Sequence, residues 1–395
     1  MGLPAIKNTN LYIHIPFCKS LCPYCPYNRV RYHKNLVAPY IKALLKEIDL
    51  YANAAGHIDI SSVYIGGGTP TNAIDELGVV IDQIRKSFQI TGDIAIETTV
   101  ADINQHCVDA MKKIGINMIS LGVQSFDDRL LKLLGRNYRS NQIEPAITML
   151  KQSGFDTINI DLMFALPGQK EADIIQDLNR LITLGVDQIT TYPLFTFPYT
   201  TVGEYQHLNK IKMPGLFTRR RQYRLIHDYL IGQGFERVSV WGFQKGGKHR
   251  YSSVTRDQYI GLGAGAASSF DTRFYFNTFS IEAYEQQLQN NHSPAAVQMN
   301  VTPSLQRWYW LYWKLYDTHF SLDDVKQVFG TNTFIVKWIK WFKWLGLCTI
   351  KDDEVSLTES GSFWIHLAQN YFILDYINKV WAAMKKEPYP HHIPF

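Results

Sequence analysis

Three cysteines, Cys18, Cys22 and Cys25, lie within one short segment near the start of the chain. The segment follows a run of β-forming residues, Leu11 to Ile15, and a Pro16-Phe17 turn. Three thiolates on one loop can hold three irons of a 4Fe-4S cube and leave the fourth iron open to a ligand that is not protein. The spacing therefore predicts a metal centre that performs chemistry on a bound small molecule.

Two other uses of these cysteines are weaker. A structural zinc ion usually takes four protein ligands, and the nearest further donors are His14, inside the expected strand, and His33. Disulfides are disfavoured because the chain has only five cysteines in 395 residues and no pairing pattern. We interpret Cys107 and Cys348 as ordinary buried residues.

Short β-rich runs alternate with helix-length segments over the first half of the chain. The predicted strands are Leu11 to Ile15, Val63 to Ile65, Ile94 to Glu97, Met118 to Leu121, Thr157 to Met163 and Gln188 to Leu194. This alternation predicts an α/β fold with a parallel sheet and right-handed crossovers, most naturally a partial barrel. Active sites of such sheets lie at the carboxyl ends of the strands, which is where the cysteines follow the first strand.

Polar residues recur at the ends of these strands, although the inner face of a parallel barrel is normally apolar. They are Tyr12 and His14 on one face of strand one, Glu97 at the end of strand three, Gln124 after strand four, and Asn159 and Asp161 on one face of strand five. The second strand runs into Gly66-Gly67-Gly68-Thr69-Pro70, whose glycines can direct backbone amides at a small zwitterion. A site at this end of the sheet explains the set better than a buried structural network.

The pattern changes after residue 195. We predict a barrel domain over 1–200, a substrate-side extension over 201–300 and an aromatic-rich module over 301–395. In the last part, Asp352 to Glu354 reads as a hairpin turn between two short strands, and Thr358 begins a final helix. The order of elements predicts a mostly helical, winged-helix-like lid. Trp338, Trp341 and Leu345 fall at helical spacing, which favours a packed core over a base-stacking platform.

Composition limits the partners. The formal net charge is only +5 and is widely spread, so we predict no nucleic-acid partner. No apolar run reaches the roughly 18 residues of a membrane span, and a cytoplasmic protein is expected. The one dense basic run, Arg219 to Arg221, is either a solvated helix face or a contact for a substrate or partner carrying carboxylates.

The motifs together resemble the radical S-adenosylmethionine (SAM) superfamily. A narrower set is similar to oxygen-independent coproporphyrinogen III oxidase and its haem-chaperone, haem-degrading and class C methyltransferase relatives: Tyr12 to Cys18, Gly66 to Pro70, Leu121 to Phe126, Leu134 to Arg136, and Asp161 to Gln169. The resemblance implies a partial (β/α)6 TIM-like barrel in which Cys18, Cys22 and Cys25 hold a 4Fe-4S cluster. It also implies SAM contacts at Tyr12, Gly67, Gly68, Thr69, Glu97, Gln124, Arg136, Asp161 and Met163. We take Tyr12 and His14 as candidate catalytic residues.

Two departures from the resemblance bear on the reaction. The oxidase has a further Cys where this chain has Tyr27, and the His-Asn-x-x-Tyr-Trp motif of the haem chaperones is replaced by the stretch from His249 to Tyr259. We therefore predict a radical SAM enzyme acting on an aromatic or conjugated substrate, as a class C-type methyltransferase with one or two SAM molecules. A coproporphyrinogen oxidase-like tetrapyrrole enzyme and a haem-binding chaperone are the alternatives. Resemblance also implies an electron donor such as flavodoxin or ferredoxin.

Overall fold

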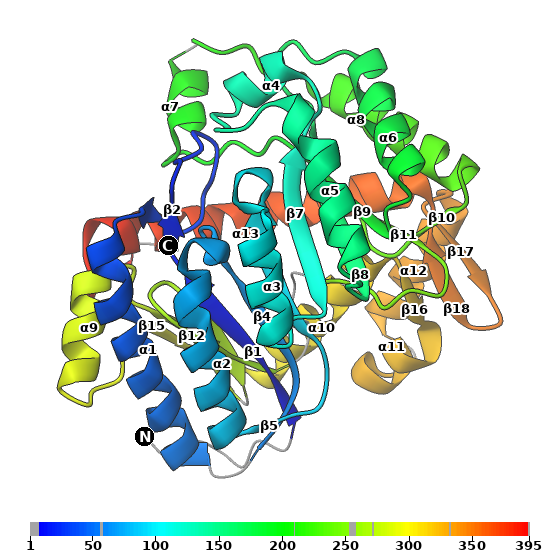
Figure 1. Cartoon of the computed structure of the whole chain (residues 1–395). Coiled ribbons are helices and arrows are strands. Elements are labelled where there is room, and N and C mark those ends of the chain that lie inside the picture. Colours follow the sequence, from blue (N-terminus) through cyan, green and yellow to red (C-terminus); the bar gives the residue numbers. More distant parts are fainter. Residues whose placement is uncertain are drawn as a thin grey trace.

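The computed structural model describes residues 8–55, 58–208, 210–252, 258–270, 272–331 and 333–393. Its centre is a run of six parallel strands that are neighbours in one sheet in chain order (Figure 1). They are β1 (Asn8–Ile15), β4 (Asp59–Gly67), β6 (Ile94–Thr99), β7 (Met118–Gln124), β8 (Thr157–Phe164) and β9 (Gln188–Pro193). Each contains or closely matches one predicted strand, so the α/β prediction with a parallel sheet is confirmed.

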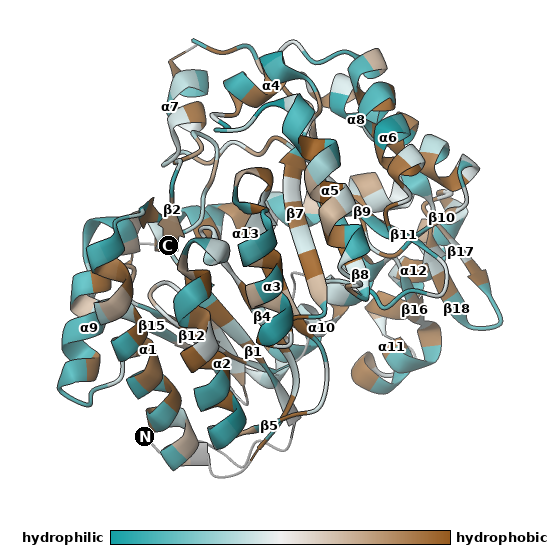
Figure 2. Ribbon diagram, in the orientation of Figure 1, coloured by the Kyte–Doolittle hydropathy of each residue, from teal (hydrophilic) through white to brown (hydrophobic). Residues whose placement is uncertain are grey.

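Helices fill the crossovers between these strands. They are α1 (Lys34–Ala55), α2 (Ile74–Ser87), α3 (Gln105–Lys113), α4 (Asp128–Leu133), α5 (Ile143–Gln152) and α6 (Glu171–Leu184). In α2 the buried positions Ile74, Leu77, Val80, Ile81 and Ile84 follow helical spacing, so one face packs on the sheet. Figure 2 shows the resulting division into apolar and polar helix faces. All seven residues of β7 are buried, as expected for a strand covered on both sides.

The sheet extends beyond the predicted strands at both edges. The strand β12 (Tyr259–Leu262) pairs in parallel with β1, and β13 (Ala267–Phe270), β14 (Arg273–Asn277) and β15 (Ala295–Asn300) continue from it. Beyond β9 lie β11 (Gly242–Lys245) and β10 (Phe235–Arg237), both antiparallel. Two helices, α7 (Thr201–His207) and α8 (Leu216–Gly232), precede these strands, and α9 (Ile281–Gln289) precedes β15. The segment predicted as 201–300 thus completes the same sheet.

The last part of the chain has its own small core. It contains α10 (Pro303–Asp317), β16 (His319–Ser321), α11 (Leu322–Phe329), α12 (Phe334–Trp344), β17 (Cys348–Lys351), β18 (Glu354–Leu357) and α13 (Glu359–Lys386). The hairpin is confirmed, with positive φ values at Asp352 and Asp353, and β16 adds a third strand. The helix α13 then crosses the side of the sheet opposite α1, α2 and α3 (Figure 1). Its Trp381 contacts Tyr27 in the cysteine segment, with ring centroids 6.1 Å apart.

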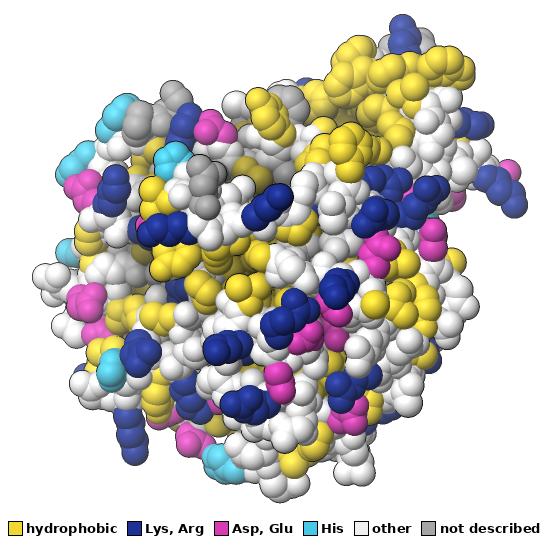
Figure 3. Space-filling view, turned by 90° about the horizontal axis from the view of Figure 1, so that it is seen from above, with side chains coloured by type: hydrophobic (Ala, Val, Ile, Leu, Met, Phe, Trp, Pro, Cys, Tyr) yellow, Lys and Arg dark blue, Asp and Glu magenta, His cyan; other side chains and the backbone are white. Residues whose placement is uncertain are grey.

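The prediction that Trp338, Trp341 and Leu345 form a packed core is wrong. Their exposed fractions are 42%, 51% and 43%. The helix α12 is apolar on two faces, and its smaller aliphatic residues Ile335, Val336 and Ile339 occupy the core instead. Hydrophobic side chains accordingly gather on the projection at the upper right of Figure 3, the side on which this module lies. Within the described residues, no helix is both long and apolar enough to cross a membrane.

Candidate active site

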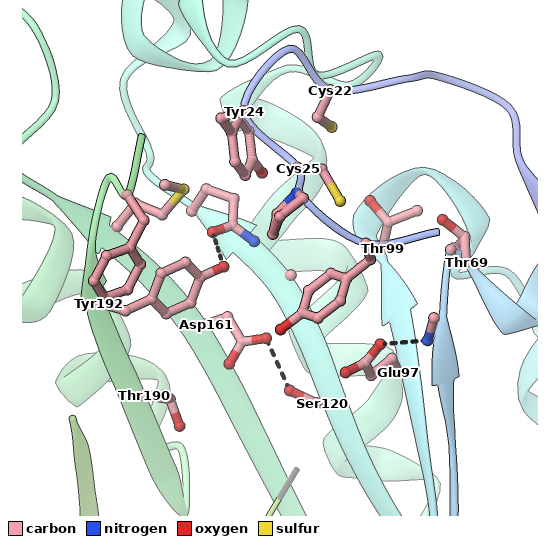
Figure 4. A pocket seen from close by; sticks show the side chains of 18 of the residues that line it. Cys22, Tyr24, Cys25, Thr69, Glu97, Thr99, Ser120, Asp161, Thr190 and Tyr192 are labelled. Carbon is pink, nitrogen blue, oxygen red and sulfur yellow. Dashed lines mark hydrogen bonds between the residues drawn. The ribbon is translucent and has the colours of Figure 1, made fainter. Parts of the chain in front are cut away.

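A cavity of about 450 Å³ lies at the carboxyl ends of the parallel strands (Figure 4). The cysteine segment and the turn after β4 line one part of it, and the ends of β6, β7, β8 and β9 line another. Residues of α10 and α13 also line the cavity. The volume falls in the range of about 300 to 1,000 Å³ typical of small-molecule sites. The cavity lies at the edge of the sheet where the sequence predicts the site.

The three predicted cluster ligands share this cavity. Cys18, Cys22 and Cys25 are all free thiols that line it. Cys18 lies in β2 (Phe17–Cys18), which pairs with β3 (Val30–Arg31), and the Cys25 amide donates to the Cys22 carbonyl at 3.3 Å. Within the described residues, no set of three His, Cys, Asp or Glu side chains is placed to bind one metal ion together. Three thiolates on one segment suit a cluster, in which each thiolate binds a different iron.

The glycine turn after β4 packs directly beneath the cysteine segment. The Gly68 amide donates to the Ile15 carbonyl, and the Thr69 amide donates to the Phe17 carbonyl, both at 2.9 Å. A Cβ atom on Gly68 would lie 2.7 Å from the Pro16 carbonyl and 3.0 Å from Cys18 Sγ. The Thr69 hydroxyl lies 3.6 Å from the same sulfur. A residue without a side chain at position 68 is therefore what lets the turn approach the cluster ligands.

Glu97 lies at the same turn. Its Oε2 accepts a hydrogen bond from the Gly67 amide at 3.2 Å, and its Oε1 accepts one from the Tyr64 hydroxyl. The Tyr251 hydroxyl donates in turn to Tyr64 at 2.7 Å. Burial raises the pKa of Glu97 to about 7. A carboxylate at this place can bind an ammonium group, as the methionine part of SAM carries.

The raised pKa of Glu97 gives a pH prediction. Below a pKa of about 7 the carboxyl becomes neutral and no longer attracts an ammonium group, so SAM affinity should rise as the pH increases through this value. Isothermal titration with SAM from about pH 6.5 to 7.5, below the range in which the α-amino group of SAM loses its proton, measures the profile. In Glu97→Gln, which cannot ionise, the rise over this range should be lost. An unchanged profile in that variant would show that another group titrates.

Asp161, Gln124 and Arg136 lie on the other side of the cavity. Asp161 accepts hydrogen bonds from Ser120 at 3.0 Å and from Asn159 at 2.8 Å, and burial raises its pKa to about 6. Gln124 has a φ of 69°, and its side-chain oxygen accepts from the Tyr192 hydroxyl at 2.9 Å. Arg136 donates to the Tyr24 hydroxyl at 2.6 Å and forms no ion pair with a described residue. Its guanidinium therefore keeps capacity for a ligand carboxylate.

Met163 also lines the cavity, so all the predicted SAM contacts except Tyr12 belong to its wall. Asp161 offers a test of that set. Asp161→Ala should lose about 1.5 to 3 kcal/mol of SAM binding free energy, the scale of a hydrogen bond to a charged group. Asp161→Asn keeps one acceptor oxygen and should lose less. Cluster content should be unchanged in both; lost iron with unchanged SAM affinity would make Asp161 structural.

Tyr12 and His14 lie behind the wall. The His14 Nε2 donates to the Asn28 carbonyl at 2.8 Å, so its Nδ1 accepts from the Tyr12 hydroxyl at 2.8 Å. Burial lowers the pKa of His14 to about 4. The Tyr12 ring stacks on Tyr64, with centroids 5.9 Å apart and an angle of 22° between the planes. A catalytic role for either residue stays a prediction; their contacts suit support of Tyr64 and the glycine turn.

Several residues that line the cavity are not among those predicted from the sequence. Ser120 and Thr190 pair in register with Asn159 and Asp161 in the neighbouring strand, so strand periodicity carried a signal for them. For three further wall residues the sequence gives no such signal, because they lie outside the parallel strands. They are Tyr251, Tyr316 and His366. Tyr192 and Trp241 also line the cavity.

Comparison with known proteins agrees with this geometry. The pattern of the family described as Radical SAM superfamily matches residues 12–181. The haem chaperone HemW of Bacillus subtilis (strain 168) is 30% identical over 262 residues, covering 65% of this chain and 69% of that protein. This chain is a radical SAM protein of the coproporphyrinogen III oxidase and HemW family. Membership implies a 4Fe-4S cluster and SAM as cofactors.

This radical SAM protein is also similar to two coproporphyrinogen III oxidases. The oxygen-independent coproporphyrinogen III oxidase of Bradyrhizobium diazoefficiens is 28% identical over 310 residues, covering 72% of this chain and 68% of that enzyme. The structure of coproporphyrinogen III oxidase (HemN) from Escherichia coli has the same fold, with a TM-score of 0.78, 21% identity and coverage of 93% and 90% of the two chains. These relatives are haem chaperones and oxidases, so they give no support to the predicted methyltransferase.

Proposed function

We propose that this protein is a radical SAM enzyme that modifies a tetrapyrrole. The observation that carries the proposal is the continuity of one cavity. The three cysteines and the SAM-contact residues lie in the same cavity as Tyr316 of α10 and His366 of α13. A substrate placed against the carboxyl-terminal module therefore shares its site with the radical source. The names of the relatives, which refer to haem and coproporphyrinogen, favour a tetrapyrrole.

The side chains of the wall have distinct tasks in this proposal. Glu97 and the Gly67 and Gly68 backbone hold the ammonium end of one SAM molecule, and Arg136 holds its carboxylate. Asp161 and Gln124 accept hydrogen bonds from the ribose hydroxyls, and Met163 contacts the adenine. Cys18, Cys22 and Cys25 would hold the 4Fe-4S cluster, which, with an electron from a donor such as flavodoxin or ferredoxin, would supply reductive cleavage of SAM to methionine and a 5'-deoxyadenosyl radical.

Aromatic side chains form part of the cavity wall. Phe195, Phe197 and Trp241 line the cavity, and Trp241 packs edge to face on Tyr223 with centroids 5.3 Å apart. An apolar wall suits the flat conjugated ring of a tetrapyrrole.

Anaerobic turnover with a reductant tests the proposal. Cluster-loaded protein is incubated with SAM and, separately, with haem, coproporphyrinogen III and a non-tetrapyrrole aromatic compound. We expect 5'-deoxyadenosine to form in proportion to a tetrapyrrole product of changed mass. S-adenosylhomocysteine is quantified in the same samples to detect methyl transfer. The proposal fails if no tetrapyrrole raises 5'-deoxyadenosine above the uncoupled background.

A haem-binding chaperone is the second candidate, and the 30% identity with HemW favours it. The stretch that begins at His249 and replaces the chaperone motif gives it no support. His249 lies at the surface, with 72% of its side chain exposed and its Nδ1 3.8 Å from Asp93. A chaperone would bind haem and release it unchanged to an apo-protein without consuming SAM. Recovery of unmodified haem with no 5'-deoxyadenosine would decide for that function.

A further inference from the structure

His366 is a buried imidazole in the wall of the cavity that no SAM contact uses. It lies in α13, is 5% exposed, and lines both the main cavity and an adjoining cavity of about 170 Å³. Its ring packs edge to face on Trp241 and Tyr316, with centroids 5.3 Å away in each case. These two aromatic side chains thus fix the position of a titratable group between the two cavities.

The tautomer of His366 is fixed by Gln369, one turn further along α13. The Gln369 amide nitrogen donates to the Tyr312 carbonyl at 3.0 Å, so its oxygen faces His366 Nδ1 at 3.2 Å. Nδ1 therefore carries the proton and Nε2 carries the free lone pair. Burial lowers the pKa of His366 to about 4, so the ring is neutral at physiological pH. No described residue hydrogen bonds to Nε2.

This arrangement is the one that metal-binding histidines use. A ligating imidazole commonly donates its other ring N–H to a protein oxygen, which sets its orientation and basicity. Iron in a haem is often held by a single histidine. A neutral, oriented imidazole with a free Nε2 in an aromatic cavity meets the requirements of an axial ligand.

A positively charged side chain, that of Arg219, lines the smaller cavity together with His366. In the predicted basic run, Arg220 pairs with Glu359, with Nη2 and Oε2 2.6 Å apart, and Arg221 pairs with Glu171. Arg219 lines the smaller cavity, donates from Nε to the Pro214 carbonyl at 3.2 Å, and forms no ion pair with a described residue. Its remaining N–H groups can bind a carboxylate. The same cavity is lined by Phe195, Trp241 and Phe363.

We propose that the substrate is an iron-loaded tetrapyrrole whose metal is ligated by Nε2 of His366 and whose acidic side chain binds Arg219. The inference rests on the proposed function and sharpens it, since a metal-free macrocycle offers nothing for His366 to ligate. It also assigns the acidic ligand of the basic run to Arg219 alone. Gln369 is a positioning residue that orients the imidazole.

Haem titration followed by absorbance and electron paramagnetic resonance tests the ligation. Wild-type protein should give a Soret band and an iron spectrum of a histidine complex. His366→Ala should lose that spectrum, and added imidazole should restore it. His249→Ala, which alters the exposed histidine of the chaperone-like stretch, should behave as wild type. An unchanged spectrum and affinity in His366→Ala would overturn the ligation.

A milder variant guards against a folding defect in His366→Ala. Gln369→Leu removes the acceptor of the Nδ1 proton, together with the hydrogen bond to the Tyr312 carbonyl, and keeps His366 itself. The iron–histidine stretching frequency in resonance Raman spectra of the ferrous complex should therefore fall while haem stays bound. The same frequency in wild type and Gln369→Leu would contradict the proposed orientation of His366. Thermal unfolding and iron content of each variant give the state of the fold and the cluster.

The contact between Arg219 and the acidic side chain of the substrate is tested by a double cycle, which changes Arg219 in the protein and the carboxylates of haem. Arg219→Gln should bind haem at least about tenfold more weakly, on the scale of a hydrogen bond to a charged group. The dimethyl ester of haem should bind wild type with a similar loss and should show no further loss in the variant. If Arg219→Gln weakens the diacid and the ester equally, Arg219 does not bind the acidic side chain.

Metal-free substrates separate this inference from the proposed function. Coproporphyrinogen III is used as the metal-free probe and haem as the iron-loaded one, with 5'-deoxyadenosine as the readout. We expect turnover with haem in wild type and its loss in His366→Ala. Turnover with coproporphyrinogen III that is equal in both proteins would leave the proposed function intact and refute the ligation. Failure of both probes to bind would refute both.

Discussion

Cys22→Ala is expected to yield protein without a stable 4Fe-4S cluster and without measurable SAM cleavage. Each of the three cysteines faces the same cavity, and no further cysteine lines it to replace a lost thiolate. Loss of a ligand therefore leaves one iron of the cube without its protein bond. Iron and sulfide content after anaerobic reconstitution, with the electron paramagnetic resonance spectrum of the reduced protein, measures the effect.

The chain offers two matched controls for Cys22→Ala. Cys107 is buried in α3 and Cys348 is buried in β17, and neither lines the cavity. Cys107→Ala and Cys348→Ala should keep full cluster content, with at most a modest loss of thermal stability from the deleted sulfur. Full cluster content in Cys22→Ala would remove the cysteine segment from the site.

Gly68→Ala is expected to disrupt the site without removing any ligand. The added methyl group would lie 2.7 Å from the Pro16 backbone and 3.0 Å from Cys18 Sγ, so the turn must move away. That movement breaks the hydrogen bond from Gly68 to Ile15 and shifts Gly67, whose amide contacts Glu97. Because both the cluster segment and the SAM contacts are displaced, we expect SAM cleavage to fall by about a hundredfold or more, the upper end of the overpacking scale.

Gly215→Ala is the control for that variant. A Cβ atom on Gly215 meets nothing within 4 Å, and its φ of −69° is open to any residue. It should keep wild-type SAM cleavage. Wild-type activity in Gly68→Ala would show that the turn and the cysteine segment are further apart in the active protein.

Much of the site could be predicted from the sequence because it is built from local patterns. The cysteine spacing, the glycine turn after β4 and the polar ends of strands such as Glu97 and Asp161 are readable from a few neighbouring residues. Parallel strands then place these residues at one edge of the sheet. The structure brings Glu97, Gln124, Arg136 and Asp161 into one cavity, as expected.

The substrate side could not be predicted in the same way. Tyr251, Tyr316 and His366 come from a loop and two helices, and only the tertiary fold brings them to the cavity. Helical periodicity also failed to predict which residues of α12 are buried, because its aliphatic and aromatic residues both follow helical spacing. A hydrophobic pattern shows that a helix has apolar faces, and packing decides which of them is buried.

Tyr27 is one of the two predicted departures from the oxidase and chaperone motifs, and the structure shows where it lies. The resemblance to the oxidase places a further cysteine of that family at this position; in this chain Tyr27 lines the cavity and contacts Trp381 of α13. A thiol at that place is thus replaced by an aromatic ring that joins the cysteine segment to the carboxyl-terminal module. Tyr27 belongs to the boundary between the cluster and the proposed tetrapyrrole site.

The most direct measurement is hydrogen transfer from substrate to the SAM-derived radical. A tetrapyrrole deuterated on its side chains and bridging carbons is incubated with reduced, cluster-loaded protein and unlabelled SAM, and 5'-deoxyadenosine is analysed by mass spectrometry. Radical chemistry on a tetrapyrrole in the shared cavity predicts 5'-deoxyadenosine heavier by one mass unit, formed in step with a modified macrocycle. Unlabelled 5'-deoxyadenosine with fully recovered, unchanged tetrapyrrole would contradict it.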